Sequence, residues 1–371
     1  MTDAQKQVQD AIDQLVESGA ETGLQVAVYK DGELIVDAVA GVADPATGRP
    51  VTSDTPFYSA STGKGVTATV AHVLAERGVI GYDTRIVELW PEFGVHGKEN
   101  ATVRHALTHS VGVPAVPADT TPEDLANWQK MVDVIAASEP WWEPGTKTGY
   151  HALTFGYIVG EIVRRATGKR ISTVLREDVA GPLGVADELF LGVPESALDR
   201  RAVLEDAPGA DQMLAFLPPD FPLLKAAPPA VMPSAAFGNR ADVLTADIPA
   251  GGTMSARSVA RMYAALLGEV DGVRLVSSDR LREISSLATT GFDEMTTGPA
   301  TWSLGYSIGR PGSSPEDSPT VFGMVGMGGS AAYADTATGI TFALTKNKFN
   351  PMESSAVEQI DQLVTKVVAG G

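Results

Sequence analysis

The chain has 371 residues, 44% of them hydrophobic and 20% charged, a balance that is typical of a globular protein and excludes a disordered one. Its formal net charge of -18 repels nucleic acid and anionic lipid, so we expect neither a nucleic acid nor a membrane as a partner. The chain contains no cysteine, which excludes disulfides, thiolate nucleophiles and zinc–thiolate sites.

Length and the distribution of apolar residues limit the architecture. A single hydrophobic core rarely extends over so long a chain, so we expect two subdomains. No apolar run approaches the roughly 18 residues that a bilayer-spanning helix needs. The first 23 residues lack the basic and apolar segments of an export signal, and we therefore expect a cytoplasmic protein. The sequence gives no signal for an oligomeric state.

The first 80 residues carry strong local signals. Apolar residues recur at helical spacing between positions 8 and 16 and predict an amphipathic helix. Two β-rich runs, 24–29 and 33–40, flank Asp31-Gly32 and predict a β-hairpin, because both turn residues tolerate positive φ. The pattern then becomes helical over residues 61–77, where apolar residues share one face of the helix.

The middle of the chain is mostly helical until about residue 190, and residues 155–167 are the clearest of its helices. The stretch 217–233 then carries many prolines among apolar residues. Proline lacks the N–H that an α-helix and a paired β-strand need, so we expect an irregular segment here. Such a segment can form a lid or pocket wall, or it can be a packed surface excursion, and both interpretations stay open.

The last 120 residues return to strands. A helix is expected after Ser255, and the chain closes with a second helix in which apolar residues from Val357 to Val367 recur at helical spacing. Strand-like runs lie between the two helices at 302–308, 321–324, 330–334 and 340–346.

The order of these elements predicts an α+β fold. Strands at both chain ends build one antiparallel sheet, flanked by the N- and C-terminal helices. We expect residues 1–80 and 245–371 to form this mixed α/β domain. Residues 81–244 then form a helical domain that includes a lid-like segment at 199–244.

The segment Ser61-Thr62-Gly63-Lys64 combines a nucleophile with a base. Three residues apart on a helix, Ser61 and Lys64 share one face. The free N–H groups and the positive end of the helix dipole favour a developing oxyanion at Ser61. A neutral Lys64 amine can take the serine proton if burial or another cation lowers its pKa. Alone, this S-x-x-K pattern also fits an ordinary N-cap serine beside an exposed lysine.

Two later segments can complete such a site. Tyr150 follows Trp142-Glu143-Pro144-Gly145, and its phenol is a candidate proton relay whose pKa a nearby Lys64 cation lowers. The alternative is a tyrosine that caps a loop. The glycine-rich run 322–330 allows a ligand to approach a strand backbone closely and offers an N–H as an oxyanion donor, or it is simply a bulged strand.

Taken together, these motifs resemble the class C β-lactamase and family VIII carboxylesterase group of serine hydrolases, which also includes penicillin-binding-protein-like enzymes. The resemblance runs from about residue 20 to the C-terminus, and its motifs follow one another in the family order. The segments that carry it are FYSASTGK (57–64), LTHSVGVP (107–114), WEPG with YHALTFGYIVGEI (142–162), DIPAGGTMSARSVARMYAAL (247–266) and FGMVGMGGSAAYADTATGITFA (322–343).

The resemblance implies a β-lactamase/transpeptidase-like fold with the site between its two domains. By position it implies that Ser61 is the nucleophile, Lys64 the base, and Tyr150 the partner base and proton relay. The backbone N–H groups of Ser61 and Met327 would form the oxyanion hole. No metal-ligand cluster is evident in the sequence, and we expect neither a metal nor a cofactor.

Two departures from the family's β-lactamases indicate an esterase. The Asn of their Tyr-x-Asn motif, which binds the substrate amide, is replaced by Ala152. Their Lys-Thr-Gly triplet, whose Lys holds the β-lactam carboxylate, is replaced by Met324-Val325-Gly326. A pocket without these polar anchors favours apolar acyl esters over β-lactams.

One Lys-Thr-Gly triplet does occur, at Lys147-Thr148-Gly149, but it precedes Tyr150 and lies far from the C-terminal strands. We interpret it as a coincidence. His109 is expected to be structural. His151 follows Tyr150 and faces the pocket or packs behind it. The remaining pocket candidates are Ala152, the Met324-Val325-Gly326 triplet, and three aromatic residues chosen for their character alone, Trp142, Phe216 and Phe221.

The sequence therefore predicts a serine carboxylesterase that cleaves a small-molecule ester through an acyl-enzyme on Ser61. Three alternatives share this chemistry: a β-lactamase, a D-amino-acid peptidase or amide hydrolase, and an acyltransferase in which an alcohol or amine replaces water. A non-catalytic ligand-binding relative of the same fold is a further alternative, against which the intact Ser61, Lys64 and Tyr150 speak.

Overall fold

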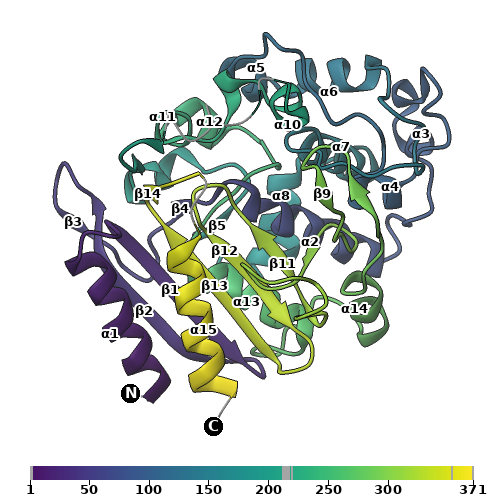
Figure 1. Cartoon of the computed structure of the whole chain (residues 1–371). Coiled ribbons are helices and arrows are strands. Elements are labelled where there is room, and N and C mark those ends of the chain that lie inside the picture. The colour runs from purple at the N-terminus through teal and green to yellow at the C-terminus, as the bar shows by residue number, and fades with distance from the viewer. Residues whose placement is uncertain (1–2, 211–217, 219, 352–353, 370–371) are drawn as a thin grey trace.

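The computed structural model describes residues 3–210, 218, 220–351 and 354–369 (Figure 1). Its helices are α1 Asp3–Glu17, α2 Gly63–Glu76, α3 Ile86–Leu89, α4 Val103–Leu107, α5 Pro122–Ala126, α6 Trp128–Ala137, α7 Thr154–Thr167, α8 Ile171–Leu175, α10 Pro222–Ala226, α11 Ala235–Gly238, α12 Ala241–Thr245, α13 Ala256–Leu267, α14 Ser278–Ile284 and α15 Ser355–Ala369. Its strands are β1 Gly23–Lys30, β2 Glu33–Asp44, β3 Arg49–Pro50, β4 Phe57–Tyr58, β5 Leu189–Phe190, β6 Glu205–Asp206, β7 Thr253–Met254, β8 Phe292–Asp293, β9 Gly298–Pro299, β10 Ser307–Ile308, β11 Val321–Val325, β12 Ala331–Asp335, β13 Ile340–Lys346 and β14 Lys348–Phe349.

The two ends of the chain share one antiparallel sheet. Among the described residues this sheet has seven strands in the order β10-β11-β12-β13-β1-β2-β3. Strand β13, near the C-terminus, pairs with β1, near the N-terminus, and places Lys346 opposite Leu24. Strands β1 and β2 form the hairpin around Asp31-Gly32 that the sequence predicts. The predicted antiparallel sheet built from both chain ends is therefore confirmed.

Helices cover both faces of this sheet. Figure 1 shows the two terminal helices, α1 and α15, side by side on one face and α13 on the other. Val8 and Ile12 of α1 and Ile360 of α15 are fully buried in one apolar cluster with the sheet residues beneath them. Burial of these apolar stripes is what holds the terminal helices in place. The predicted flanking helices are thus confirmed.

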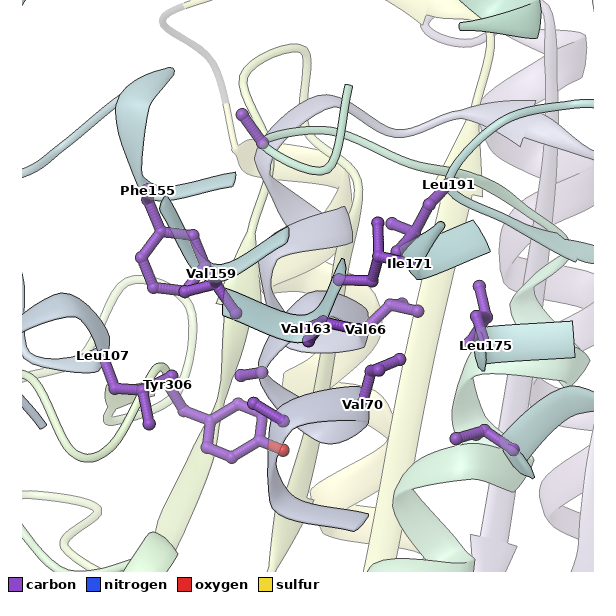
Figure 2. Close-up of a cluster of buried hydrophobic side chains, with 14 of the residues drawn as sticks. Val66, Val70, Leu107, Phe155, Val159, Val163, Ile171, Leu175, Leu191 and Tyr306 are labelled. Carbon is purple, nitrogen blue, oxygen red and sulfur yellow. The ribbon is translucent and has the colours of Figure 1, made fainter. Parts of the chain in front are cut away.

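Helix α2 lies at the centre of the molecule. Its residues from Gly63 to Ala75 are all buried, so the helix is enclosed on every side rather than along the single face that the sequence indicates. Figure 2 shows Val66 and Val70 of this helix beside Val163 of α7 and Leu175 of α8. The first residues of α2 are therefore fixed by a closely packed core.

One large hydrophobic cluster extends from the sheet, through α2, into the helices of the middle segment. The proposed division of the chain at residues 80 and 245 remains a prediction. Within the ranges that the structure describes, no helix is long and apolar enough to cross a membrane.

Two segments differ from their predicted conformation. Residues 302–308 form a strand only at Ser307–Ile308, because positive φ at Gly305 turns the chain just before it. The described part of the proline-rich stretch is not wholly irregular. It contains α10 and a 3-10 turn, Pro229–Val231, each with proline in its first turn, where the missing N–H leaves no hydrogen bond unmade.

Candidate active site

Ser61 lies in a 3-10 turn, Ala60–Thr62, that joins β4 to α2. The Ser59 N–H donates to the Gly252 carbonyl at 2.8 Å on one side of the turn. On the other side the Thr62 hydroxyl donates to the Ser330 carbonyl at 3.1 Å. Ala60 has φ of 43°, a strained conformation for a residue with a side chain. The turn that presents Ser61 is thus tied to two neighbouring segments.

Two glycines allow those segments to approach so closely. A Cβ atom at Gly63 would lie 2.2 Å from the Gly251 carbonyl carbon, and one at Gly326 would lie 2.2 Å from the Ser59 carbonyl oxygen. Neither position tolerates a side chain. The expectation that the 322–330 glycines make room for a ligand is corrected at Gly326, where the close neighbour is the protein's own backbone.

The three predicted catalytic residues meet at one oxygen atom. The Lys64 Nζ donates to the Ser61 Oγ at 3.0 Å, and the Tyr150 Oη donates to the same Oγ at 2.7 Å. Lys64 also donates to the Ala250 carbonyl at 2.8 Å. The sequence places Ser61 and Lys64 together by helical spacing, whereas Tyr150 arrives from a loop 89 residues further along the chain.

The environment of Lys64 suits a base. Its side chain is fully buried, and within the described residues it forms no ion pair. Burial disfavours the ammonium form and lowers the pKa of Lys64 to about 7. A substantial fraction of this amine is therefore neutral near pH 7, which meets the condition that the sequence analysis sets for a lysine base.

The pKa of Tyr150 moves opposite to the sequence-based prediction. Burial, aided by the nearby Asp293 carboxylate, raises the pKa of Tyr150 to about 12 despite the hydrogen bond to Ser61. The expected lowering by Lys64 is wrong because burial also shifts Lys64 toward its neutral form. The Lys64 Nζ lies 5.0 Å from the centre of the Tyr150 ring. Tyr150 is therefore a neutral phenol that can donate a proton.

Two residues that the sequence analysis missed hold Tyr150 in position. The Tyr150 N–H donates to the Asp293 Oδ1 at 3.1 Å, and the Trp302 Nε1–H donates to the Asp293 Oδ2 at 3.1 Å. The Trp302 ring stacks on the Tyr150 ring with centres 5.4 Å apart and planes within 8°. Asp293 lies in a stretch without a recognisable motif, and Trp302 was assigned to a strand, so neither had a sequence signal.

Ser61 and Tyr150 face a cavity with mostly apolar walls. Several described residues of the proline-rich stretch line this cavity. The interpretation of the stretch as a pocket wall therefore fits the structure better than its interpretation as a surface excursion. The lining residues are Tyr58, Ala60, Ser61, Tyr150, Ala152, Leu153, Leu223, Ala227, Val231, Met232, Pro233, Phe237, Ile248, Ala250, Gly251 and Met327.

The backbone N–H groups of Ser61 and Met327 are available at this cavity. Both residues line it, and among the described residues neither N–H donates to a protein acceptor. Met327 lies in a turn whose Gly326 N–H donates to the Ser330 carbonyl at 2.7 Å. The turn is thus bonded within itself, and the Met327 N–H is left for a ligand.

The other predicted pocket residues divide into two groups. Ala152 lines the cavity as expected. Met324 and Val325 instead border a separate groove along β10 and β11, and Gly326 packs against Ser59. The prediction that the 324–326 triplet lines this cavity is therefore corrected.

The aromatic candidates lie outside the cavity wall. Trp142 packs behind Tyr150 with Ala226 and Met295, and its Nε1–H donates to the Ser110 carbonyl. Phe221 precedes α10 without lining the cavity. Phe216 lies outside the described residues.

His109 and His151 support the site from behind. His151 does not face the cavity, because its Nδ1 bonds the Gly149 carbonyl at 2.6 Å and its Nε2 accepts from the Val113 N–H at 3.1 Å. Burial lowers the pKa of His151 to about 4. His109 accepts from the His151 N–H at 3.0 Å and packs against Trp302 with ring centres 4.4 Å apart. His109 is structural, as predicted, and placing His151 in the pocket is corrected.

The Lys147-Thr148-Gly149 triplet has no place in the cavity. Lys147 is exposed and pairs with Glu294 at 3.1 Å, and the Thr148 hydroxyl donates to the Thr108 carbonyl at 2.9 Å. Among the described residues, no group of three or more histidine or acidic side chains could hold a metal ion.

An antiparallel sheet with terminal helices and a hydrogen-bonded Ser–Lys–Tyr cluster defines an enzyme of the β-lactamase/transpeptidase-like fold. The family model described as Beta-lactamase matches residues 8–365. The chain therefore belongs to the β-lactamase family, a family of serine hydrolases that includes esterases and β-lactamases.

Several known proteins are similar to this chain over most of its length. The Esterase/beta-lactamase LipL of Mycobacterium tuberculosis is 35% identical over 88% of this chain and 77% of its own. The crystal structure of a family VIII carboxylesterase matches with a TM-score of 0.89 and 30% identity, covering 99% of this chain and 98% of that one. A penicillin-binding protein homologue from Caulobacter crescentus matches with a TM-score of 0.82 and 30% identity, covering 97% and 96%.

Proposed function

We propose that this protein hydrolyses carboxylic esters through an acyl-enzyme on Ser61. The observation that carries the proposal is the pair of hydrogen bonds at the Ser61 Oγ, 3.0 Å from a buried lysine amine and 2.7 Å from a neutral tyrosine phenol. A nucleophile with a base and a proton donor in contact has the groups that acyl transfer needs.

In the first step the Ser61 Oγ attacks the ester carbonyl carbon and a C–O bond forms. The neutral Lys64 amine takes the hydroxyl proton, since its pKa of about 7 keeps it available as a base. The carbonyl oxygen becomes an oxyanion, and the N–H groups of Ser61 and Met327 stabilise it.

In the second step the bond to the alcohol oxygen breaks. Tyr150 gives its phenol proton to the leaving alkoxide, and the proton held by Lys64 restores the phenol. Water then attacks the acyl-enzyme carbonyl, passes a proton to Lys64, and releases the acid while Ser61 regains its hydrogen. The three side chains end each cycle in their starting protonation states.

The composition of the cavity supports an ester substrate over a β-lactam. Ala152 lines it where the family's β-lactamases carry an amide, and among the described lining residues there is no charged side chain to hold a carboxylate. A pocket of this kind discriminates against substrates that carry a charged carboxylate. The solved family VIII carboxylesterase with a TM-score of 0.89 supports the same choice.

β-Lactam hydrolysis is the second candidate, because the name of the 35% identical LipL includes both activities. Acyl transfer to an alcohol or amine would use the same acyl-enzyme. Faster turnover of the acyl-enzyme when an alcohol is added would identify such a transferase.

Hydrolysis of p-nitrophenyl butyrate and of nitrocefin, with wild type and Ser61→Ala, tests the proposal. We expect turnover of butyrate that Ser61→Ala abolishes, together with weak nitrocefin cleavage. Nitrocefin turnover above butyrate turnover would replace the esterase proposal by the β-lactamase alternative. Full butyrate turnover by Ser61→Ala would exclude Ser61 as the nucleophile.

A further inference from the structure

The cavity contains one hydroxyl group that the proposed chemistry does not use. Of the described residues that line it, three carry a hydroxyl: Tyr58, Ser61 and Tyr150. Ser61 and Tyr150 bond to each other. Tyr58 belongs to neither the nucleophile nor the proton relay, so its role has to be sought in what the cavity binds.

Strand β4 and its neighbours fix the Tyr58 side chain. Tyr58 pairs with Thr253 of β7, and its ring meets Phe237 edge-on with centres 6.2 Å apart. The hydroxyl lies close to the nucleophile turn. A Cβ atom built at Gly251 would be 3.5 Å from the Ala60 carbonyl oxygen and 3.7 Å from the Tyr58 Oη. The hydroxyl and the residue before Ser61 therefore border the same small space.

The Tyr58 hydroxyl has no partner in the protein. Within the described ranges no residue forms a hydrogen bond with its Oη, and burial alone raises the pKa of Tyr58 above its ordinary value. The group is thus a protonated phenol with a free donor. The half-buried Tyr58 side chain lines the cavity, so its donor is open to an acceptor atom on a bound ligand. Phenylalanine would fill the same space but could not form this hydrogen bond.

We propose that Tyr58 is a specificity residue that donates a hydrogen bond to an oxygen atom in the acyl part of the substrate, so that the preferred esters carry an ether, keto or hydroxyl oxygen a few atoms from the scissile carbonyl. This inference rests on the proposed esterase function. The acyl part stays bonded to Ser61 between the two steps, beside Tyr58, whereas the alcohol leaves and water enters.

Two matched pairs of p-nitrophenyl esters test this inference. Methoxyacetate has an ether oxygen where butyrate has a methylene, and 3-methoxypropanoate bears the same relation to pentanoate. For each pair the quantity measured is the ratio of kcat/KM for the ether ester to kcat/KM for its hydrocarbon partner. Comparing the ratio between variants cancels the different intrinsic reactivity of the two esters.

Tyr58→Phe is the first variant. We expect this ratio to fall about 5- to 50-fold for at least one pair, since one hydrogen bond to a neutral donor is lost. Turnover of butyrate stays within about twofold, because the bond is absent with that substrate. Thermal stability stays the same or rises, since the hydroxyl has no protein partner to lose.

Gly251→Ala is a second variant that keeps the hydroxyl but blocks access to it. Its methyl group would meet its neighbours at ordinary van der Waals distances, so the fold accommodates it. We expect the same loss of preference for ether esters. Tyr263→Phe is the matched control, since it removes a buried, unpartnered hydroxyl outside the cavity lining, and its ratios should equal those of the wild type.

Ratios that stay within twofold of wild type for both pairs in Tyr58→Phe would overturn the inference. Equal losses on ether and hydrocarbon esters would also overturn it, because they would assign Tyr58 a structural role. A wild-type protein that hydrolyses none of the four esters would contradict the proposed function itself, which is a distinguishable result.

Discussion

The floor and the wall of the cavity are built in different ways. On the floor, Ser61, Lys64 and Tyr150 are joined by hydrogen bonds, and Asp293 fixes Tyr150 from behind. The residues of 222–233 that form the wall are all apolar and lie in or directly after two short helical turns. A hydrogen-bonded cluster has one productive geometry, whereas apolar contacts tolerate changes of size and shape. We infer that the floor sets the rate of the chemistry and the wall sets which acyl chains fit.

Substitutions on the floor of the cavity should reduce the rate most severely. Lys64→Met keeps the approximate volume of the side chain and removes the base. We expect kcat for p-nitrophenyl butyrate to fall about 10²- to 10⁴-fold, the usual contribution of a general base. KM should change little, since Lys64 lies beneath the nucleophile and does not line the cavity. Activity above a tenth of the wild-type value, measured in steady-state kinetics, would remove Lys64 from the mechanism.

The pH dependence of kcat/KM tests the role of Lys64 as the base without a mutation. Burial lowers the pKa of Lys64 to about 7, and the neutral amine is the active form. The value of kcat/KM should therefore rise about tenfold per pH unit below 7 and level off above it. Tyr150, with a pKa raised to about 12, stays protonated throughout this range. A profile that is flat from pH 5 to pH 9 would contradict a lysine base.

Asp293→Asn tests whether the support of the floor matters. Asparagine retains one acceptor oxygen, but its amide NH₂ is a donor. The groups that bond to the Asp293 carboxylate are themselves N–H donors, so this NH₂ would face no acceptor among them. We expect kcat to fall about tenfold and the free energy of unfolding to fall by about 1–3 kcal/mol. Because Asp293 is a positioning residue, the midpoint of the pH profile should stay near 7. Kinetics across pH and denaturant unfolding give both quantities.

Changes in the wall should affect substrate choice more than rate. Leu223→Ala enlarges the cavity, so we expect the ratio of hexanoate to butyrate turnover to rise about two- to fourfold for each methylene that gains contact. Leu224→Ala is the matched control, because Leu224 lies beside it on α10 without lining the cavity. Equal shifts in both variants would mean that this wall does not select the acyl chain.

Much of the fold can be predicted because its signals are local. The Asp31-Gly32 turn indicates a hairpin, and the apolar stripes of the terminal helices indicate the face that is buried. The pairing of β1 with β13 joins residues more than 300 positions apart, and no local pattern gives its register. The order of the elements, with strands at both ends and helices between them, indicates that both ends share a sheet but not how their strands are paired.

The candidate site shows the same limit. Helical spacing brings Ser61 and Lys64 together, and the resemblance adds Tyr150. The sequence analysis missed Asp293 and Trp302 because a buried aspartate and a stacked tryptophan are recognised by what they contact. The pKa of Tyr150 was predicted in the wrong direction because its burial could not be derived from the sequence.

Labelling with a fluorophosphonate tests directly whether Ser61 is the nucleophile and whether a neutral Lys64 activates it. Such a probe forms a stable phosphorus–oxygen bond to the nucleophile and releases fluoride, so the labelled residue can be identified by peptide mass spectrometry. This mechanism predicts one adduct, on Ser61, formed at a rate that increases with pH through about 7 and lost in Ser61→Ala. An adduct on another residue, or undiminished labelling of Ser61→Ala, would contradict it.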